Sequence, residues 1–207
     1  MYRNYDSFNI FNEEEIDSYF NQKLMELKNK IYSLPQSQIL DGLSDVQRQE
    51  ILKEFTIDKP EFDMESAKAA VKEVEVSSED LGSSFYTHPG RIYKKNMVTY
   101  YIPVKGDSNL LRYIPSQQRL MWTEEVYICD SDLCVDIKVF SENADQIKRE
   151  FDHFKSSAIT QLGHLNREIS GYNNSLDNKI NEYISSRKNE IARKDSLASS
   201  LGVPIRE

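Results

Sequence analysis

The feature that most constrains this fold is an apolar stripe in the last third of the 207-residue chain. Its members are Ile147, Phe151, Phe154, Ala158, Leu162, Leu165, Ile169, Tyr172, Leu176, Ile180 and Tyr183. Ten steps of three or four residues cover 36 positions, so the mean period is 3.6. That period is typical of a straight amphipathic α-helix and differs from the 3.5 of a left-handed coiled coil. The stripe therefore predicts a long helical face that must be buried.

A cluster of helix-breaking residues interrupts this stripe. Gly171 is a poor helix former, and Asn173 to Ser175 carry side chains that favour a helix N-terminus. We therefore expect two helices, roughly 143–170 and 176–195. Because the stripe stays in phase across the interruption, one continuous kinked helix is the alternative.

The first part of the chain also has a helical pattern. Apolar residues repeat at helical spacing after three glutamates, which favour a helix N-terminus, and this helix should end before Pro35. Ser44 and Gln47 match a capping box, which predicts a second, shorter helix. Together these features predict a helical hairpin over residues 1–55. The apolar residues of the first helix are Ile16, Phe20, Leu24, Leu27, Ile31 and Leu34.

The middle of the chain, residues 56–142, has the pattern of β-strands. Val71, Val74 and Val76 predict short strands at a sheet edge, and a loop rich in Ser and Gly should follow from Ser77 to Pro89. Connections this short favour antiparallel pairing, because parallel neighbours need a crossover of about a dozen residues or more. The strand candidates are Arg91 to Val104, Leu110 to Ile114, Arg119 to Trp122, Glu125 to Cys129 and Leu133 to Phe140.

The sequence thus predicts an α+β fold: a small antiparallel β-sheet flanked by an N-terminal helical hairpin and long C-terminal helices. Its three parts are residues 1–55, 56–142 and 143–207. We expect them to form one integrated domain, because two or more independent domains are improbable at this length.

Charge and composition narrow the function class. The formal charge is -8, with regional sums of -9, 0 and +1 over residues 1–80, 81–142 and 143–207. The acidic first part argues against a general polyanion binder. Only two cysteines are present, and no apolar run is long enough to span a membrane or to resemble a signal peptide. We expect a cytoplasmic protein with no membrane partner, in which Cys129 and Cys134 are free thiols.

No motif for catalysis, cofactor binding or metal binding stands out. The sequence has no glycine-rich phosphate loop and no G-x-S-x-G. His153 and His164 lie about 16 Å apart on the expected helix, too far to share a metal ion. Asp136 and Lys138 give a short D-x-K string of the kind found in metal-dependent nucleases, and a nuclease centred on them is a weak alternative. We expect no cofactor, no metal and no enzymatic activity.

The best binding candidates are basic and aromatic residues that alternate on the predicted strands. Aromatic rings can stack on bases while cations contact phosphates, so a nucleic-acid or nucleotide platform is the main alternative function. Tyr and Trp are also ordinary strand residues, which makes a purely structural role the simpler interpretation. The candidates are Arg91, Lys94, Lys95, Tyr101, Arg112, Tyr113, Arg119 and Trp122.

Several segments, taken in order, resemble a known group of sequences. They are Phe55 to Pro60, Ile102 to Asp107, Leu111 to Ser116, Ser186 to Lys188 and, most specific, the tail from Asp195 to Ile205. The chain is similar to the N-terminal region of uncharacterised bacterial proteins that carry a C-terminal restriction-endonuclease-like PD-(D/E)xK domain or a TIR domain. The resemblance covers most of the chain.

The resemblance implies a regulatory role rather than catalysis. In the similar proteins the chain continues into the effector domain, whereas this sequence ends at Glu207, so no catalytic residue of that domain can be assigned here. We expect a regulatory, sensing or assembly module that acts on an effector domain or partner protein, with self-association through the C-terminal helices as a further option. A role in antiphage defence follows by analogy alone.

Overall fold

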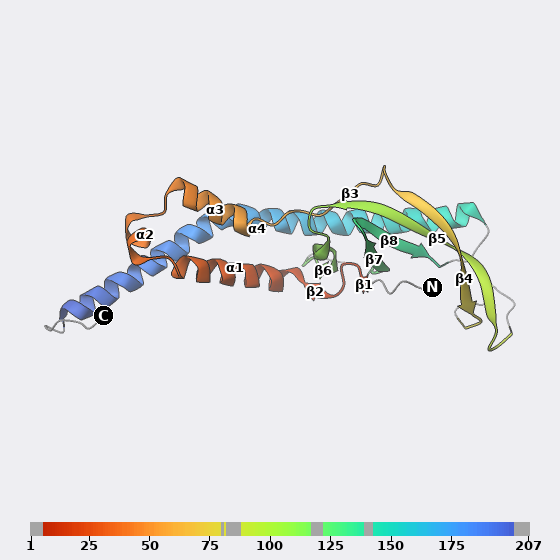
Figure 1. The fold of residues 1–207 in the computed structure, drawn as a ribbon, viewed down its shortest axis with the longest axis horizontal. Coiled ribbons are helices and arrows are strands. Elements are labelled where there is room, and N and C mark those ends of the chain that lie inside the picture. Colours follow the sequence, from red (N-terminus) through yellow and green to blue (C-terminus); the bar gives the residue numbers. More distant parts are fainter. Residues whose placement is uncertain (1–5, 80, 82–87, 117–121, 139–142, 201–207) are drawn as a thin grey trace. The chain divides into compact units, whose positions relative to one another are not determined.

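The computed structural model describes residues 6–79, 81, 88–116, 122–138 and 143–200. The fold is α+β, with a small antiparallel sheet and a long C-terminal helix (Figure 1). The chain divides into two compact units, each built from two separate segments. One unit comprises Met1–Glu15 and Asp58–Asn166, here called the sheet unit, and the other comprises Ile16–Ile57 and Arg167–Glu207, here called the helical unit. The sequence-based division at residues 55 and 142 stays a prediction.

The sheet unit contains one antiparallel sheet and one short parallel pair. The sheet has the order β1-β7-β8-β5-β3, and β4 also pairs with β5. Its bounds are β1 Ser7–Asn9, β3 Glu61–Phe62, β4 Lys68–Ser77, β5 Ile92–Lys105, β7 Glu125–Cys129 and β8 Asp132–Ile137. The parallel pair is β2 Glu14–Glu15 with β6 Tyr113–Ile114. The antiparallel pairing that the short connections predicted is therefore confirmed for the six-stranded sheet.

Strand β5 is the central element of this sheet. It pairs with β8 over Val98 to Pro103 and with β4 over Ile92 to Tyr101. Within the described residues, positions 92–97 of β5 therefore pair only with β4, and the two strands continue beyond the sheet as a ribbon (Figure 1). The valines of β4 were expected to give short strands, but they belong to one strand of 10 residues.

One predicted strand, Leu110 to Ile114, needs correction, and two others extend into positions outside the described residues. Residues Leu110 to Ile114 are mostly a 3-10 helix, η1 Ser108–Arg112, and not a strand. The Asp107 side chain accepts a hydrogen bond from the Asn109 N–H at 3.0 Å and starts this turn. Leu110 and Leu111 are both fully buried, which a strand with one buried face cannot achieve for adjacent residues. Positions 117–121 and 139–142 lie outside the described residues, and Trp122 lies in no strand.

The core of the sheet unit lies between the sheet and the first part of helix α4, Ala144–Ser200. One face of the sheet contributes buried apolar residues, and the helix contributes the first buried members of the stripe (Figure 1). The rings of Tyr100 and Phe151 stack at 3.7 Å between centroids. The buried residues are Phe8, Val98, Ile102, Val126, Leu133, Val135 and Ile137 on the sheet and Phe154, Ala158, Leu162 and Leu165 on the helix.

The helical unit contains α1 Ile16–Tyr32, α2 Gln36–Asp41, α3 Asp45–Phe55 and the second part of α4. The predicted end of α1 before Pro35 and the capping box of Ser44 and Gln47 are confirmed, whereas α2 was not predicted. Phe20 stacks on Tyr172 at 4.9 Å between centroids. The guanidinium of Arg48 pairs with the Asp177 carboxylate at 2.7 Å. These contacts join α1 and α3 to α4.

Helix α4 is continuous, so the expected pair of helices is wrong and the continuous alternative holds. Gly171 lies on the exposed side of the helix, and a Cβ there would meet no atom within 4 Å. The Asn173 side chain does not cap a new helix. Its Oδ1 accepts from the Ile57 N–H and its Nδ2 donates to the Ile57 carbonyl, both at 3.0 Å. Gly171 is therefore tolerated because it lies on the exposed side of the helix, and Asn173 because its side chain bonds to the backbone of Ile57.

The apolar stripe is buried in both units, as its period predicted. Ile169, Tyr172, Leu176 and Ile180 are buried in the helical unit, together with Ile191 further along. Three members of the stripe, Ile147, Phe151 and Tyr183, are only partly buried. Among the described residues, the structure contains no helix that combines the length and the apolar character needed to cross a membrane.

Candidate functional site

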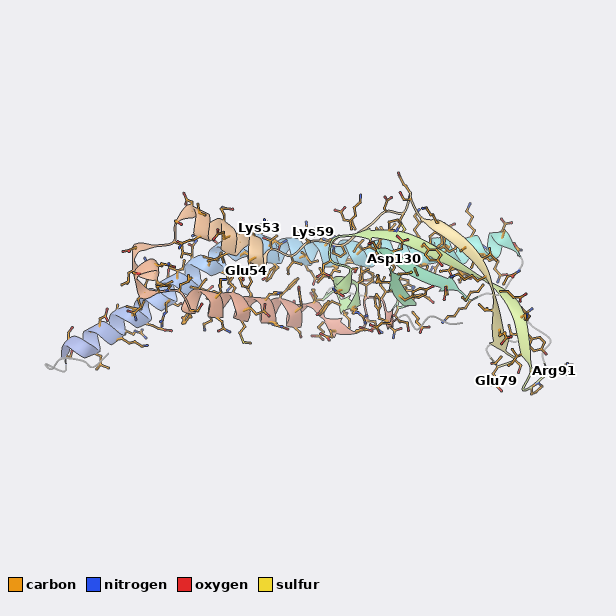
Figure 2. The ribbon with its side chains drawn as sticks, in the orientation of Figure 1. Lys53, Glu54, Lys59, Glu79, Arg91 and Asp130 are labelled. Atoms are coloured by element: carbon orange, nitrogen blue, oxygen red, sulfur yellow. The ribbon has the colours of Figure 1, made fainter. Side chains whose placement is uncertain are left out.

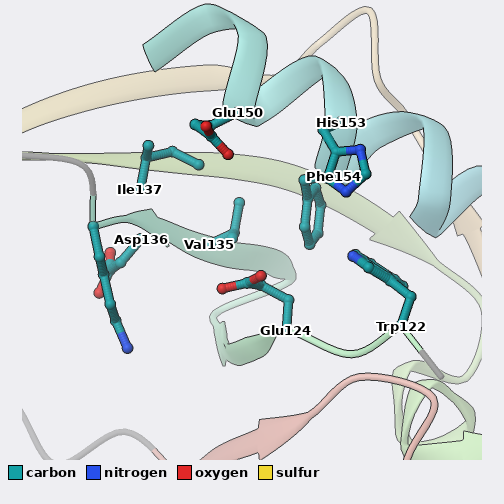
Figure 3. Close-up of a pocket in the computed structure, with 9 residues that line it drawn as sticks. Trp122, Glu124, Val135, Asp136, Ile137, Glu150, His153 and Phe154 are labelled. Atoms are coloured by element: carbon teal, nitrogen blue, oxygen red, sulfur yellow. The ribbon is translucent and has the colours of Figure 1, made fainter. Parts of the chain in front are cut away.

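A pocket of about 210 Å³ in the sheet unit is a candidate site. Three elements line it: the first turns of α4, the end of β8 and the segment from Trp122 to Glu124 (Figure 3). On α4, His153 and Phe154 follow Glu150 by three and four residues, so both lie near it on one side of the helix. The spacing of the helix therefore places two polar groups and one aromatic ring in the same pocket.

One side of the pocket is aromatic and apolar. Phe154 is 3% exposed, and the Trp122 ring meets it edge to face with centroids 5.6 Å apart. Val135 and Ile137 of β8, both buried, complete this side. Trp122 is the single tryptophan of the chain, which makes its ring a natural reporter on the pocket.

The other side of the pocket is acidic. Glu124 and Glu150 project into the same space from opposite sides of Val135 (Figure 3). Within the part of the chain that the structure describes, neither carboxylate accepts a hydrogen bond or forms an ion pair. Burial raises the pKa of Glu124 above its ordinary value of 4.5. Glu125 and Glu150 raise it further, and Lys138 and His153 oppose the shift.

Lys138, which also lines the pocket, is already engaged. Its ammonium donates to the Glu125 carboxylate at 2.7 Å, and this hydrogen bond raises the pKa of Lys138 and lowers that of Glu125. The Lys138 ammonium therefore forms its ion pair with Glu125 and not with Glu124 or Glu150. The charge that remains inside the pocket is negative.

Asp136 and Lys138, the residues of the nuclease alternative, have separate partners. The Thr99 hydroxyl donates to the Asp136 carboxylate at 2.6 Å, and the Tyr127 hydroxyl donates to the same oxygen at 3.5 Å. Among the described residues, no three His, Cys, Asp or Glu side chains are grouped as metal ligands. The contacts of both residues have a structural explanation, and the nuclease stays a prediction.

The eight residues of the predicted basic and aromatic platform are dispersed in the sheet unit. Arg91 lies at the end of the ribbon near Glu79 (Figure 2). Lys94 and Lys95 alternate along β5, so their side chains leave opposite faces of the sheet. Lys94 pairs with Glu73 at 3.0 Å.

The remaining platform candidates have structural contacts or other positions. The Tyr101 hydroxyl accepts from Lys72 at 2.7 Å. Arg112 lies over the Phe8 ring and forms 2.8 Å ion pairs with Asp6 and Glu13. Tyr113 lies in β6, Trp122 lines the pocket, and residue 119 is outside the described part of the chain. The structure thus places these residues at several sites rather than on one surface, and binding through them stays a prediction.

The two cysteines are free, as expected. Cys134 is fully buried on β8, and this burial raises the pKa of its thiol to about 12. Cys129 is half-buried at the end of β7. A thiol with so high a pKa is almost entirely protonated at neutral pH, so Cys134 is a packing residue and not a nucleophile.

Three residues that line the pocket were singled out from the sequence: Trp122 as a binding candidate, and Asp136 and Lys138 as the D-x-K string. Phe154 belongs to the predicted stripe, and His153 was placed on the expected helix without a metal-binding role. The spacing of Glu150, His153 and Phe154 could have indicated a shared helix side. No sequence signal joined them to Glu124, because that proximity arises from packing of the helix on the sheet.

Comparison with known proteins gives no assignment. No protein-family model, curated protein or solved structure matches the chain. The function is therefore argued from the residues and the geometry described above.

Proposed function

We propose that this chain is a non-catalytic regulatory module that controls a bacterial effector of the restriction-endonuclease-like or TIR type. The sheet unit would receive a signal, and the helical unit would contact or assemble the effector. The choice of effector rests on the sequence resemblance, and an antiphage role is its extension. The chain would act in the cytoplasm.

The observation that carries the proposal is the continuity of α4. One helix of 57 residues lines the acidic pocket near its start and supplies buried core residues to both units. Residues in its middle that favour a break are accommodated instead, with Asn173 bonded to the backbone of Ile57. A helix shared by two cores is a physical element through which a change in one core can bias the other.

The test is a reconstitution with an effector domain encoded beside this chain in its genome. We expect the purified chain to change effector activity by at least about fivefold, the lower range of typical coupling between sites. Gly171→Pro should abolish this control, because proline removes a helical hydrogen bond and clashes with the preceding turn. Gly171→Ala keeps the helix and should retain control.

One outcome would contradict the regulatory role itself, and another would contradict only the role of α4. An effector that neither binds the chain nor changes activity at saturating concentration excludes the regulatory role. Equal control by the Gly171→Pro and Gly171→Ala variants would leave regulation intact but remove α4 as the element that carries it. Circular dichroism of both variants establishes that each remains folded outside the substituted turn.

A further inference from the structure

The described residues of the acidic pocket in the sheet unit only partly compensate its negative charge. Glu124 is half-buried and Glu150 faces it, and neither has an ion-pair partner among the described residues. Lys138 is bound to Glu125, and Asp136 accepts from Thr99. Lys138 and His153 favour the charged form of Glu124 without forming an ion pair with it, so they compensate its partial burial only in part, and a bound cation would offset the remaining cost.

The walls of the pocket favour an organic cation over a metal ion. Among the described residues no three His, Cys, Asp or Glu side chains are grouped as metal ligands, and the two carboxylates without an ion pair lie beside Trp122 and Phe154. Aromatic faces and edges together with carboxylates are the usual surroundings of ammonium and guanidinium groups. The chemistry of the walls therefore indicates a cation with some apolar surface.

We propose that this pocket binds a small organic cation, with Glu124 and Glu150 contacting its charge and Trp122 and Phe154 its apolar part. The volume of about 210 Å³ corresponds to roughly seven water-sized volumes of 30 Å³. A methylguanidinium or propylammonium group fits within that volume. The cation could come from a free amine or from a basic peptide side chain, and the experiment separates these sources. Binding in this pocket does not depend on the regulatory role proposed above.

The single tryptophan provides the measurement. Methylguanidinium is titrated into the full chain at constant ionic strength, and Trp122 fluorescence is recorded. Methylurea, which has nearly the same shape without the charge, is the matched ligand control. We expect saturable binding with a dissociation constant of about 1 mM for methylguanidinium, a value ordinary for so small a ligand, and no saturation with methylurea.

Substitutions locate the binding site. Glu124→Gln and Glu150→Gln should each weaken binding by about tenfold, because each removes one charge-assisted contact. Asp152→Asn is the matched control. It removes the same charge from α4 two residues beyond Glu150, at a position that does not line the pocket, and should change binding by less than about twofold. Glu150 is exposed, so its variant should fold even if the Glu124 variant is perturbed.

A peptide pair identifies the source of the cation. A short peptide with one arginine is compared with the same peptide with citrulline in that position. Tighter binding of the arginine peptide than of methylguanidinium assigns the pocket to a basic side chain, and the reverse order assigns it to a free amine. Equal responses to methylguanidinium and methylurea, or equal losses in Asp152→Asn and Glu124→Gln, would overturn the proposal. So would the absence of a saturable signal up to about 20 mM.

Discussion

Helix α4 buries its apolar stripe in two different ways, although the stripe keeps one period throughout. In the sheet unit, residues such as Phe154 and Ala158 pack on a β-sheet. In the helical unit, Tyr172 stacks on Phe20 of α1, and Glu190 accepts a hydrogen bond from Tyr32, which also belongs to α1. The period therefore determines that the helix forms, and the partner is determined by residues elsewhere in the chain.

The two units also differ in how they tolerate glycine. Gly106 follows β5 with a φ of +75°, and a Cβ there would overlap the carbonyl group of Lys59. Gly171 in α4 has open space around it. The turn in the sheet unit requires glycine, whereas the helix in the other unit merely accepts it. Replacing each glycine by alanine should therefore have opposite effects on the free energy of unfolding.

The largest expected effect is that of Gly106→Ala. It should lower the free energy of unfolding by about 3 to 5 kcal/mol, because both the backbone conformation and the contact with Lys59 become strained. Gly171→Ala, the matched substitution, should raise that free energy by about 0.5 to 1 kcal/mol through helix propensity. Urea unfolding followed by Trp122 fluorescence and by circular dichroism measures both. An unchanged midpoint for Gly106→Ala would contradict the packing of this turn.

A smaller effect distinguishes two asparagines of α4, one in each unit. Asn173 makes two hydrogen bonds with the backbone of Ile57, and the Asn166 side chain donates one to the Pro60 carbonyl at 2.9 Å. Asn173→Ala and Asn166→Ala should each cost about 1 to 2 kcal/mol, since a buried backbone group is left unpaired in each case. Hydrogen exchange of the Ile57 amide should accelerate only in the first variant. Equal exchange in both would show that Asn173 does not protect this segment.

The smallest effect concerns the pocket and depends on pH. The pKa of Glu124 is raised in the folded state, so its contribution to stability is present at low pH and is lost as the pH rises through that pKa. Glu124→Gln should thus raise the melting temperature by about 1 to 2 °C near pH 7 and leave it unchanged near pH 3. Thermal unfolding across this range gives the comparison. A variant that is less stable near pH 7 would mean that Glu124 has a stabilising partner.

Much of the fold was predictable because its signals are local. The capping box of Ser44 and Gln47 and the end of α1 before Pro35 each depend on neighbours in the sequence. The break expected at Asn173 was wrong because a distant backbone segment uses that side chain. The strand expected at Leu110 to Ile114 forms only at Tyr113–Ile114, because Asp107 starts a 3-10 turn in which the adjacent leucines are buried together.

The pocket was less predictable than the fold. Trp122 was noted as an aromatic residue on a presumed strand, and its actual neighbour is Phe154 of α4. Glu124 and Glu150 are 26 positions apart, and neither belongs to a known motif. Their shared environment depends on how α4 packs on the sheet and on the ion pair that engages Lys138. Such a constellation has no period and no fixed spacing, so the sequence alone does not reveal it.

The interleaved connectivity of the two units has a consequence for biosynthesis. Each unit joins an early stretch of polypeptide to part of α4, so the chain crosses from one to the other after Glu15, Ile57 and Asn166. Translation delivers α4 after the other elements of both units, and neither hydrophobic core can close before that helix has left the ribosome. Before α4 is added, the growing chain would expose the sheet and the N-terminal helices together. Because each unit combines two separate segments, no single truncation of the chain leaves either unit complete and alone.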